Sequence, residues 1–206
     1  MGTKKNQIIV GAKGSPMSPE VETKKKPVNG RNKGSSFERV LCKSFSEWWF
    51  PLIDFKGYVL KDLPFQRTPG SGGWNRKIAG GDIQIYSNQG VWKDDFPFCV
   101  EAKNREGWEM DNISSFNAKC PVWDWWDQTN EQANDNKRLP LMVFTRNRRP
   151  EYVMMWANDF CEYVDKECPQ IQVSTGVYEE PVVITTLPEF FKHYFCQRST
   201  QCLAEN

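Results

Sequence analysis

The first periodic pattern of hydrophobic residues in the chain lies between residues 36 and 50. Its apolar side chains Phe37, Val40, Leu41, Phe45 and Trp48 recur at helical spacing, which predicts an amphipathic helix. Two short extended segments are expected within 57–68. Residues 69–81 are rich in glycine and predict a loop with two basic side chains, Arg76 and Lys77.

Later hydrophobic runs are short and predict the strands of a sheet. We expect strands at residues 80–86, 98–104, 139–145, 152–156, 171–174 and 182–186. Helical spacing predicts a helix within 113–136 and shorter helices at 157–164 and 188–196. This succession of elements indicates an α/β domain with a central mixed β-sheet flanked by helices.

The strands at 80–86 and 98–104 carry charged side chains that a buried strand does not need. In the second strand, alternation places Glu101 and Lys103 on one face, opposite an apolar face of Phe98, Val100 and Ala102. If the two strands pair as a hairpin, Asp82 and Glu101 converge. Convergent carboxylates repel each other unless a cation lies between them, and their oxygen atoms suit Mg²⁺ or Mn²⁺. The alternative is an ordinary Glu–Lys pair on a solvated strand face.

Charge is balanced over the whole chain but is unevenly distributed. The 206 residues include 27 Lys and Arg against 26 Asp and Glu, yet the N-terminal segment is strongly basic. That segment also contains several Pro and Gly and has almost no apolar periodicity, so residues 1–33 are predicted to be a disordered basic arm. Such an arm either keeps the protein in solution or follows a polyanion.

Cysteine and histidine content excludes several kinds of site. The seven cysteines contain no CxxC pair, which favours reduced thiols in a cytoplasmic setting over a disulfide framework or a zinc site. No apolar run approaches membrane-spanning length, so no membrane partner is expected. The single histidine, His193, excludes mechanisms that need several histidines. Chemistry must therefore come from carboxylates, lysine and hydroxyl groups.

Five short motifs, in order, resemble one nuclease family over about residues 33–145. They are "KGSSFER", "RTPGSGG", "GD" at 81–82, "EAK" at 101–103 and "WWDQTNEQA". Together they resemble the PD-(D/E)xK nuclease superfamily and, more narrowly, archaeal-type Holliday junction resolvases. Two departures stand out: Gly81 replaces the usual proline before the aspartate, and the part after residue 150 has no counterpart in the minimal family.

The resemblance implies roles for six residues. Asp82 and Glu101 would be the principal metal ligands, and Glu38 would reach the metal directly or through water. The remaining three are Lys103, which would position the hydroxide, Ser71, which would contact the scissile phosphate region, and Gln128, which would complete the site. Two alternatives remain open: Glu38 can close a helix capping box with Ser35, and Gln132 competes with Gln128.

The function implied by this resemblance is metal-dependent cleavage of branched DNA to leave 5′-phosphate ends. The implied fold is a restriction-endonuclease-like core over 34–150, followed by a C-terminal α/β extension over 151–206 packed on it. A resolvase is expected to be a homodimer, and a compact nuclease with a basic arm suits a phage or a mobile element. The candidate DNA-binding residues are Arg67, Arg76, Lys77, Arg105, Arg146, Arg148 and Arg149. The alternatives are a restriction-like endonuclease, a DNA-end exonuclease and a DNA-binding module that does not cleave.

Overall fold

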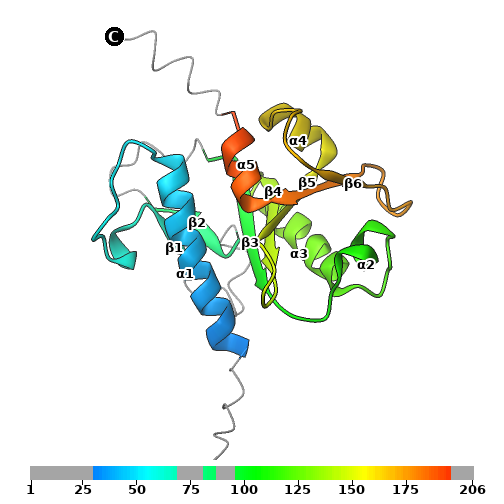
Figure 1. The fold of residues 1–206 in the computed structure, drawn as a ribbon, viewed down its shortest axis with the longest axis horizontal. Helices are drawn as coiled ribbons and strands as arrows, with labels where there is room; N and C mark the ends of the chain where they lie inside the picture. The colour runs from blue at the N-terminus through cyan, green and yellow to red at the C-terminus, as the bar shows by residue number, and fades with distance from the viewer. Residues whose placement is uncertain (1–29, 69–80, 87–95, 196–206) are drawn as a thin grey trace, which may run out of the picture.

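The computed structural model describes residues 30–68, 81–86 and 96–195. In this part of the chain seven strands form one sheet in the order β1-β2-β3-β4-β5-β7-β6 (Figure 1). β3 and β4 are parallel, and the other neighbouring pairs are antiparallel. The predicted α/β fold with a central mixed sheet is confirmed. The strands are β1 Phe65–Arg67, β2 Ile83–Ile85, β3 Phe98–Asn104, β4 Leu139–Thr145, β5 Tyr152–Trp156, β6 Ile171–Val173 and β7 Val182–Thr186.

Five α-helices and one short 3-10 helix accompany the sheet within the described residues. The longest, α1, begins at Gly30, inside the segment predicted to be a disordered arm, and the rest of that arm lies outside the described residues. The helix predicted within 113–136 is α3, and a separate short helix, α2, precedes it. The helices are α1 Gly30–Trp49, η1 Leu60–Asp62, α2 Met110–Ser114, α3 Pro121–Asp135, α4 Ala157–Tyr163 and α5 Leu187–His193.

Local sequence explains where several elements begin and why one predicted segment fails to pair. Pro121 occupies the first turn of α3, where a missing N–H leaves no hydrogen bond unmade. Thr186 precedes α5, and its hydroxyl accepts a hydrogen bond from the backbone N–H of Glu189 at 3.5 Å. Of the two extended segments expected within 57–68, only β1 joins the sheet. The other does not, because Gly57 lies in a turn with φ +92° and η1 follows directly.

Helices cover both faces of the sheet and give the protein two apolar cores. On one face α1, α4 and α5 pack over alternate residues of the strands, including Phe98, Val100 and Ala102 of β3 (Figure 1). On the other face α2 and α3 pack over Met142, Phe144 and Met154. β3 therefore turns its apolar side toward α1 and its polar side toward α3. This orientation positions the candidate site.

The strands after residue 150 continue the same sheet. β5 pairs with β4, β7 with β5, and β6 with β7. Their helices join the core of α1 through aromatic contacts, since the ring of Trp48 stacks on Phe191 with centroids 4.5 Å apart. In the described part of the chain, no helix is both long and apolar enough to cross a membrane.

Candidate active site

The pairing of β2 with β3 brings Asp82 beside Glu101. Ile83 lies opposite Val100 in the antiparallel register, and the N–H of Asp82 donates to the Val100 carbonyl at 2.8 Å. The N–H of Ala102 donates to the Asp82 carboxylate at 3.1 Å. Only 7% of Asp82 and 2% of Glu101 is exposed. The hairpin pairing expected from the sequence is thus present, and it places two carboxylates in a buried environment.

Glycine is required at position 81, where the nuclease resemblance implies proline. Its φ is +87°, a region that proline, with φ fixed near about −65°, does not reach. A Cβ atom at this position would lie 2.3 Å from the Val100 carbonyl oxygen. Thr68 holds the same turn from the other side: its hydroxyl donates to the Gly81 carbonyl at 2.6 Å, and its N–H donates to the Asp82 carbonyl at 2.9 Å. The close approach of the backbones brings Asp82 to β3.

Glu101, Lys103 and Gln128 form a connected polar group on the α3 face of β3. The Lys103 ammonium is bonded to the Glu101 carboxylate. Gln128, on α3, donates from its amide nitrogen to Glu101 at 2.9 Å and accepts from Lys103 at 3.2 Å through its amide oxygen. Glu101 therefore has two donors, although it is almost completely buried. Each member of the group fixes the position of the other two.

The electrostatics of this site favour a bound cation. Burial, followed by the nearby charge of Glu101, raises the pKa of Asp82 from its ordinary value of 3.8 to about 8. The Ala102 N–H and the Lys103 ammonium oppose this rise without cancelling it. Two carboxylates thus face one ammonium in a buried site, and their oxygen donors are those that hard divalent ions prefer. The residues present fit a Mg²⁺ or Mn²⁺ ion.

Glu38 lies on α1, which covers the opposite face of the sheet from α3. Its carboxylate is bonded to the Arg67 guanidinium. The capping-box alternative is wrong, because α1 begins at Gly30 and Ser35 therefore lies inside the helix. Of the charged groups that act on Asp82, Glu38 has the smallest influence. Among the described residues, no group of three or more His, Cys, Asp and Glu side chains is placed to hold a metal ion.

Gln132, the alternative to Gln128, is buried one helical turn further along α3. It contacts neither Glu101 nor Lys103 through any hydrogen bond within the described residues, and its amide oxygen has no partner there. His193 also lies away from this polar group, on α5, where its imidazole is 3.3 Å from Glu189. Gln128 is therefore the glutamine that contacts the polar group.

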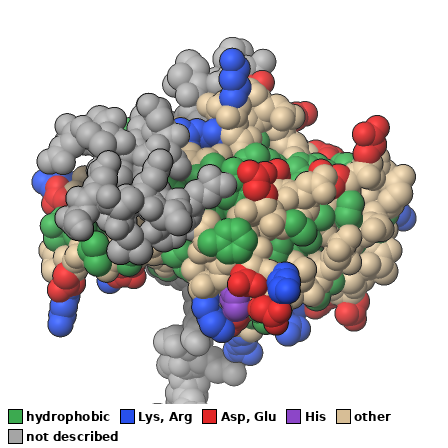
Figure 2. All heavy atoms as spheres, turned by 90° about the horizontal axis from the view of Figure 1, so that it is seen from above, with side chains coloured by type: hydrophobic (Ala, Val, Ile, Leu, Met, Phe, Trp, Pro, Cys, Tyr) green, Lys and Arg blue, Asp and Glu red, His purple; other side chains and the backbone are tan. Residues whose placement is uncertain are grey.

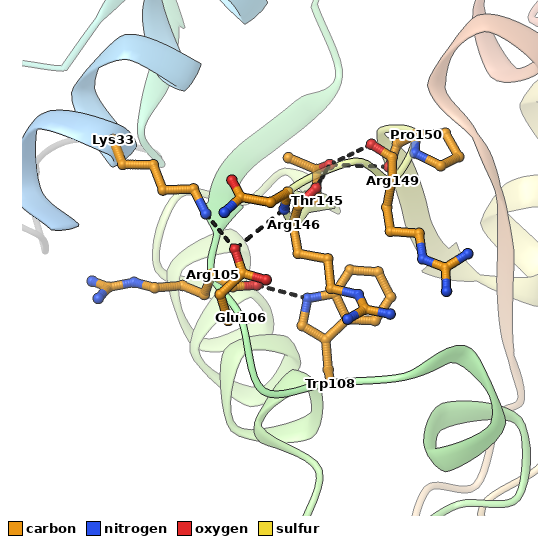
Figure 3. Close-up of polar contacts among 9 residues, drawn as sticks. Lys33, Arg105, Glu106, Trp108, Thr145, Arg146, Arg149 and Pro150 are labelled. Atoms are coloured by element: carbon orange, nitrogen blue, oxygen red, sulfur yellow. Dashed lines mark hydrogen bonds and ion pairs between the residues drawn. The ribbon is translucent and has the colours of Figure 1, made fainter. Parts of the chain in front are cut away.

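The basic residues proposed for DNA binding fall into three groups. Arg76, Lys77 and also Ser71 lie outside the described residues. Arg67 is bonded to Glu38, and Arg146 to Glu109. Arg105, Arg148 and Arg149 are exposed beyond the ends of β3 and β4, where Lys33 and Glu106 also meet (Figure 3).

Sequence reasoning missed several residues that shape this end of the sheet. Thr68 supports the turn before Asp82, and Trp108 packs beneath Arg146 with the guanidinium carbon 5.4 Å from the ring centre. Glu106 and Glu109 hold basic side chains in place. Thr68 adjoins Arg67 in the "RTPGSGG" motif, which was a usable signal. Nothing in the local sequence around Trp108 indicates its partner, since Arg146 is distant in the chain.

A family model matches most of the chain. The family is described as "phage putative PDDEXK endonuclease", and the match covers residues 29–198. No curated protein and no solved structure matches the chain significantly. The matched range includes every described element, from α1 to α5. It therefore covers both the candidate site and the strands that follow residue 150.

Proposed function

Because the chain belongs to the phage PDDEXK endonuclease family, we propose that it is a divalent-metal-dependent endonuclease that selects branched DNA. The restriction-endonuclease-like fold and a nuclease activity follow from the family. The proposal adds the metal, the substrate structure and the residues that act. The observation that supports it most is the buried pair of Asp82 and Glu101, closed on one side by Lys103 and Gln128.

Asp82 and Glu101 would hold Mg²⁺ or Mn²⁺, and Glu38 would reach the ion through water while Arg67 orients it. A divalent ion held there would lower the pKa of a bound water and neutralise charge on the phosphate. Lys103, fixed by Glu101 and Gln128, positions the attacking water with its ammonium N–H groups. Ser71 would contact the phosphate region of the scissile bond.

The reaction is hydrolysis of a phosphodiester. The water oxygen forms a bond to phosphorus, and the bond from phosphorus to the 3′ oxygen breaks. One proton of the water goes to the departing 3′ oxygen and the other to solvent, which leaves 5′-phosphate and 3′-hydroxyl ends. None of these steps needs histidine, in keeping with a chain that has only one.

A four-way junction has two symmetry-related strands to cut. An enzyme that resolves it places two sites across a two-fold axis, so we propose a homodimer. Basic residues beside the site, with Arg76 and Lys77 of the glycine-rich segment, would hold the phosphate backbone and read DNA shape rather than sequence.

The test compares labelled four-way junction, linear duplex and single-stranded DNA, each with Mg²⁺ or with EDTA. Symmetric paired nicks in the junction alone, with Mg²⁺ only, support the proposal. Degradation from duplex ends indicates an exonuclease, cleavage inside linear duplex indicates a restriction-like enzyme, and binding without cleavage indicates a non-cleaving module. Glu131→Gln serves as the matched control for Glu101→Gln. Because Glu131 is exposed on α3, the Glu131→Gln variant should cleave DNA at the wild-type rate.

A further inference from the structure

The C-terminal ends of β3 and β4 carry a cluster of charged side chains that the proposed chemistry does not use. We call it the strand-end cluster and define it as Lys33, Arg105, Glu106, Trp108, Glu109, Arg146, Arg148 and Arg149. Figure 3 labels these residues except Glu109 and Arg148. Asn104 lies opposite Thr145 in the parallel register, and the N–H of Arg105 donates to the Thr145 carbonyl at 3.1 Å. The two strand ends are thus joined directly beyond the candidate site.

Part of the strand-end cluster is an internally bonded scaffold. Glu106 accepts from the Lys33 ammonium at 2.5 Å and from the Asn147 N–H at 3.2 Å, which ties α1 to the turn after β4. Glu109 is bonded to Arg146, whose guanidinium also lies over the Trp108 ring. These cations already have anions as partners. Binding a phosphate through them would require breaking an ion pair.

The indole N–H of Trp108 donates to the Arg105 carbonyl at 2.9 Å, so the backbone of Arg105 is fixed by the same scaffold. The side chain of Arg105 is not fixed in this way. Within the described residues, neither Arg105 nor Arg148 has a side-chain hydrogen bond or ion pair. In Figure 3 the Arg105 guanidinium points away from the cluster. Arg148 lies in a turn closed by the Arg149 N–H, which donates to the Arg146 carbonyl at 3.2 Å. Its φ is +61°, a left-handed conformation rare outside glycine.

We infer that Arg105 and Arg148 are the phosphate contacts that hold a DNA strand beside the Asp82–Glu101 pair, whereas Lys33 and Arg146 are structural. This inference rests on the proposed function. Arg105 follows Lys103 by two residues, about 7 Å along an extended strand, so a backbone bound at the active site passes within reach of it. A free, exposed cation on a fixed backbone gives its full charge to a phosphate and releases a counterion as it does so.

The two carboxylates of the cluster then compete with DNA. Glu109 lies 3.8 Å from the Arg149 guanidinium as well as being bonded to Arg146. Removing its charge leaves both arginines available to phosphate, with no new side chain added. The inference therefore requires one substitution that strengthens DNA binding, a result that misfolding does not produce.

The experiment measures binding of the full chain to labelled duplex in EDTA, where no cleavage occurs, between 50 and 200 mM salt. Arg105→Ala and Arg148→Ala should each weaken binding roughly five- to tenfold at about 100 mM salt and reduce the slope of log K against log salt by about 1. Glu109→Gln should tighten binding by at least about threefold and steepen the slope.

Lys166→Ala is the control, because it removes one exposed cation at the other end of the sheet. Lys166 follows α4, and β5 before it runs antiparallel to β4. Figure 2 views that end of the molecule, where basic and acidic side chains are interspersed. Unchanged binding by Arg105→Ala and Arg148→Ala, or weaker binding by Glu109→Gln, overturns the inference even if the wild type cleaves DNA. A wild type that binds as expected but never cleaves with Mg²⁺ overturns the proposed function instead.

Discussion

Asp82→Asn should stabilise the metal-free protein while it abolishes cleavage. Burial and the charge of Glu101 raise the pKa of Asp82 from 3.8 to about 8 in the folded chain. Below pH of about 4 the carboxyl is protonated in both folded and unfolded states, so its burial costs no ionisation energy. As the pH rises toward about 8, the unfolded chain releases the proton and the folded chain keeps it, so stability is progressively lost.

The pKa of Asp82 differs between the unfolded chain, 3.8, and the folded chain, about 8. One pKa unit corresponds to about 1.4 kcal/mol, so the loss of folding stability at pH 8 is at most about 6 kcal/mol. Asparagine carries no charge to bury, and its amide oxygen can still accept the Ala102 N–H, now 3.1 Å from the carboxylate. Because the amide must also fit beside Glu101, we expect a net gain of about 2 kcal/mol. For a chain of this length, that gain raises Tm by about 4–8 °C.

The assay is thermal unfolding in EDTA at pH 5 and pH 8 for the wild type, Asp82→Asn and the exposed control Asp62→Asn. The gain from Asp82→Asn should be large at pH 8 and smaller at pH 5, whereas the control should not change Tm. Mg²⁺ at pH 8 should stabilise the wild type but not Asp82→Asn. If Asp82→Asn lowers Tm equally at both pH values, the carboxylate supports the fold and the reasoning is refuted.

Three further substitutions, two of them paired with a comparison variant, test other parts of the site. Glu101→Gln should reduce the rate of cleavage at least about 1,000-fold with DNA affinity retained; loss of binding together with cleavage, measured by gel shift, would assign Glu101 to the fold. Gln128→Ala should slow cleavage about 10- to 100-fold, because Lys103 loses a side chain that holds it in place. Gln132→Met should leave cleavage unchanged and the protein equally stable or up to about 1 kcal/mol more stable, because it removes a buried oxygen without a described partner. Equal effects of the two substitutions on cleavage would contradict the assignment of Gln128 to the site. Gly81→Ala should lower the free energy of unfolding by more than about 2 kcal/mol in chemical denaturation, since the added methyl group meets the backbone of β3. Gly107→Ala should lower it by only about 1 kcal/mol, because Gly107 also has a positive φ, +93°, but has open space around it.

Much of the fold was predictable because the strands carry strong local signals. β3, β4, β5 and β7 occupy the predicted residues, since each is a short apolar run bounded by turns or polar residues. The alternation along "FCVEAKN" also indicated that Glu101 and Lys103 share a face, as their mutual contact shows. The convergence of Asp82 and Glu101 was conditional on a hairpin pairing of β2 with β3, and that pairing is present.

Features that depend on distant contacts were not predictable. The pairing of Glu38 with Arg67 joins a helix to an edge strand, and the capping motif around Ser35 pointed to a different role. The strand-end cluster likewise joins α1 to the turns after β3 and β4, so no window of sequence contains it. The positive φ of Gly81 follows from its contact with β3, and the sequence alone showed only that proline was absent.

The central claim is that Asp82 and Glu101 together hold a divalent ion, and the most direct test is anomalous diffraction from crystals of the protein soaked with Mn²⁺. The account predicts a manganese peak between these two carboxylates in the wild type and its disappearance in Asp82→Asn. A manganese peak only at another position, or no peak beside this pair at an ion concentration that supports DNA cleavage, would contradict the claim.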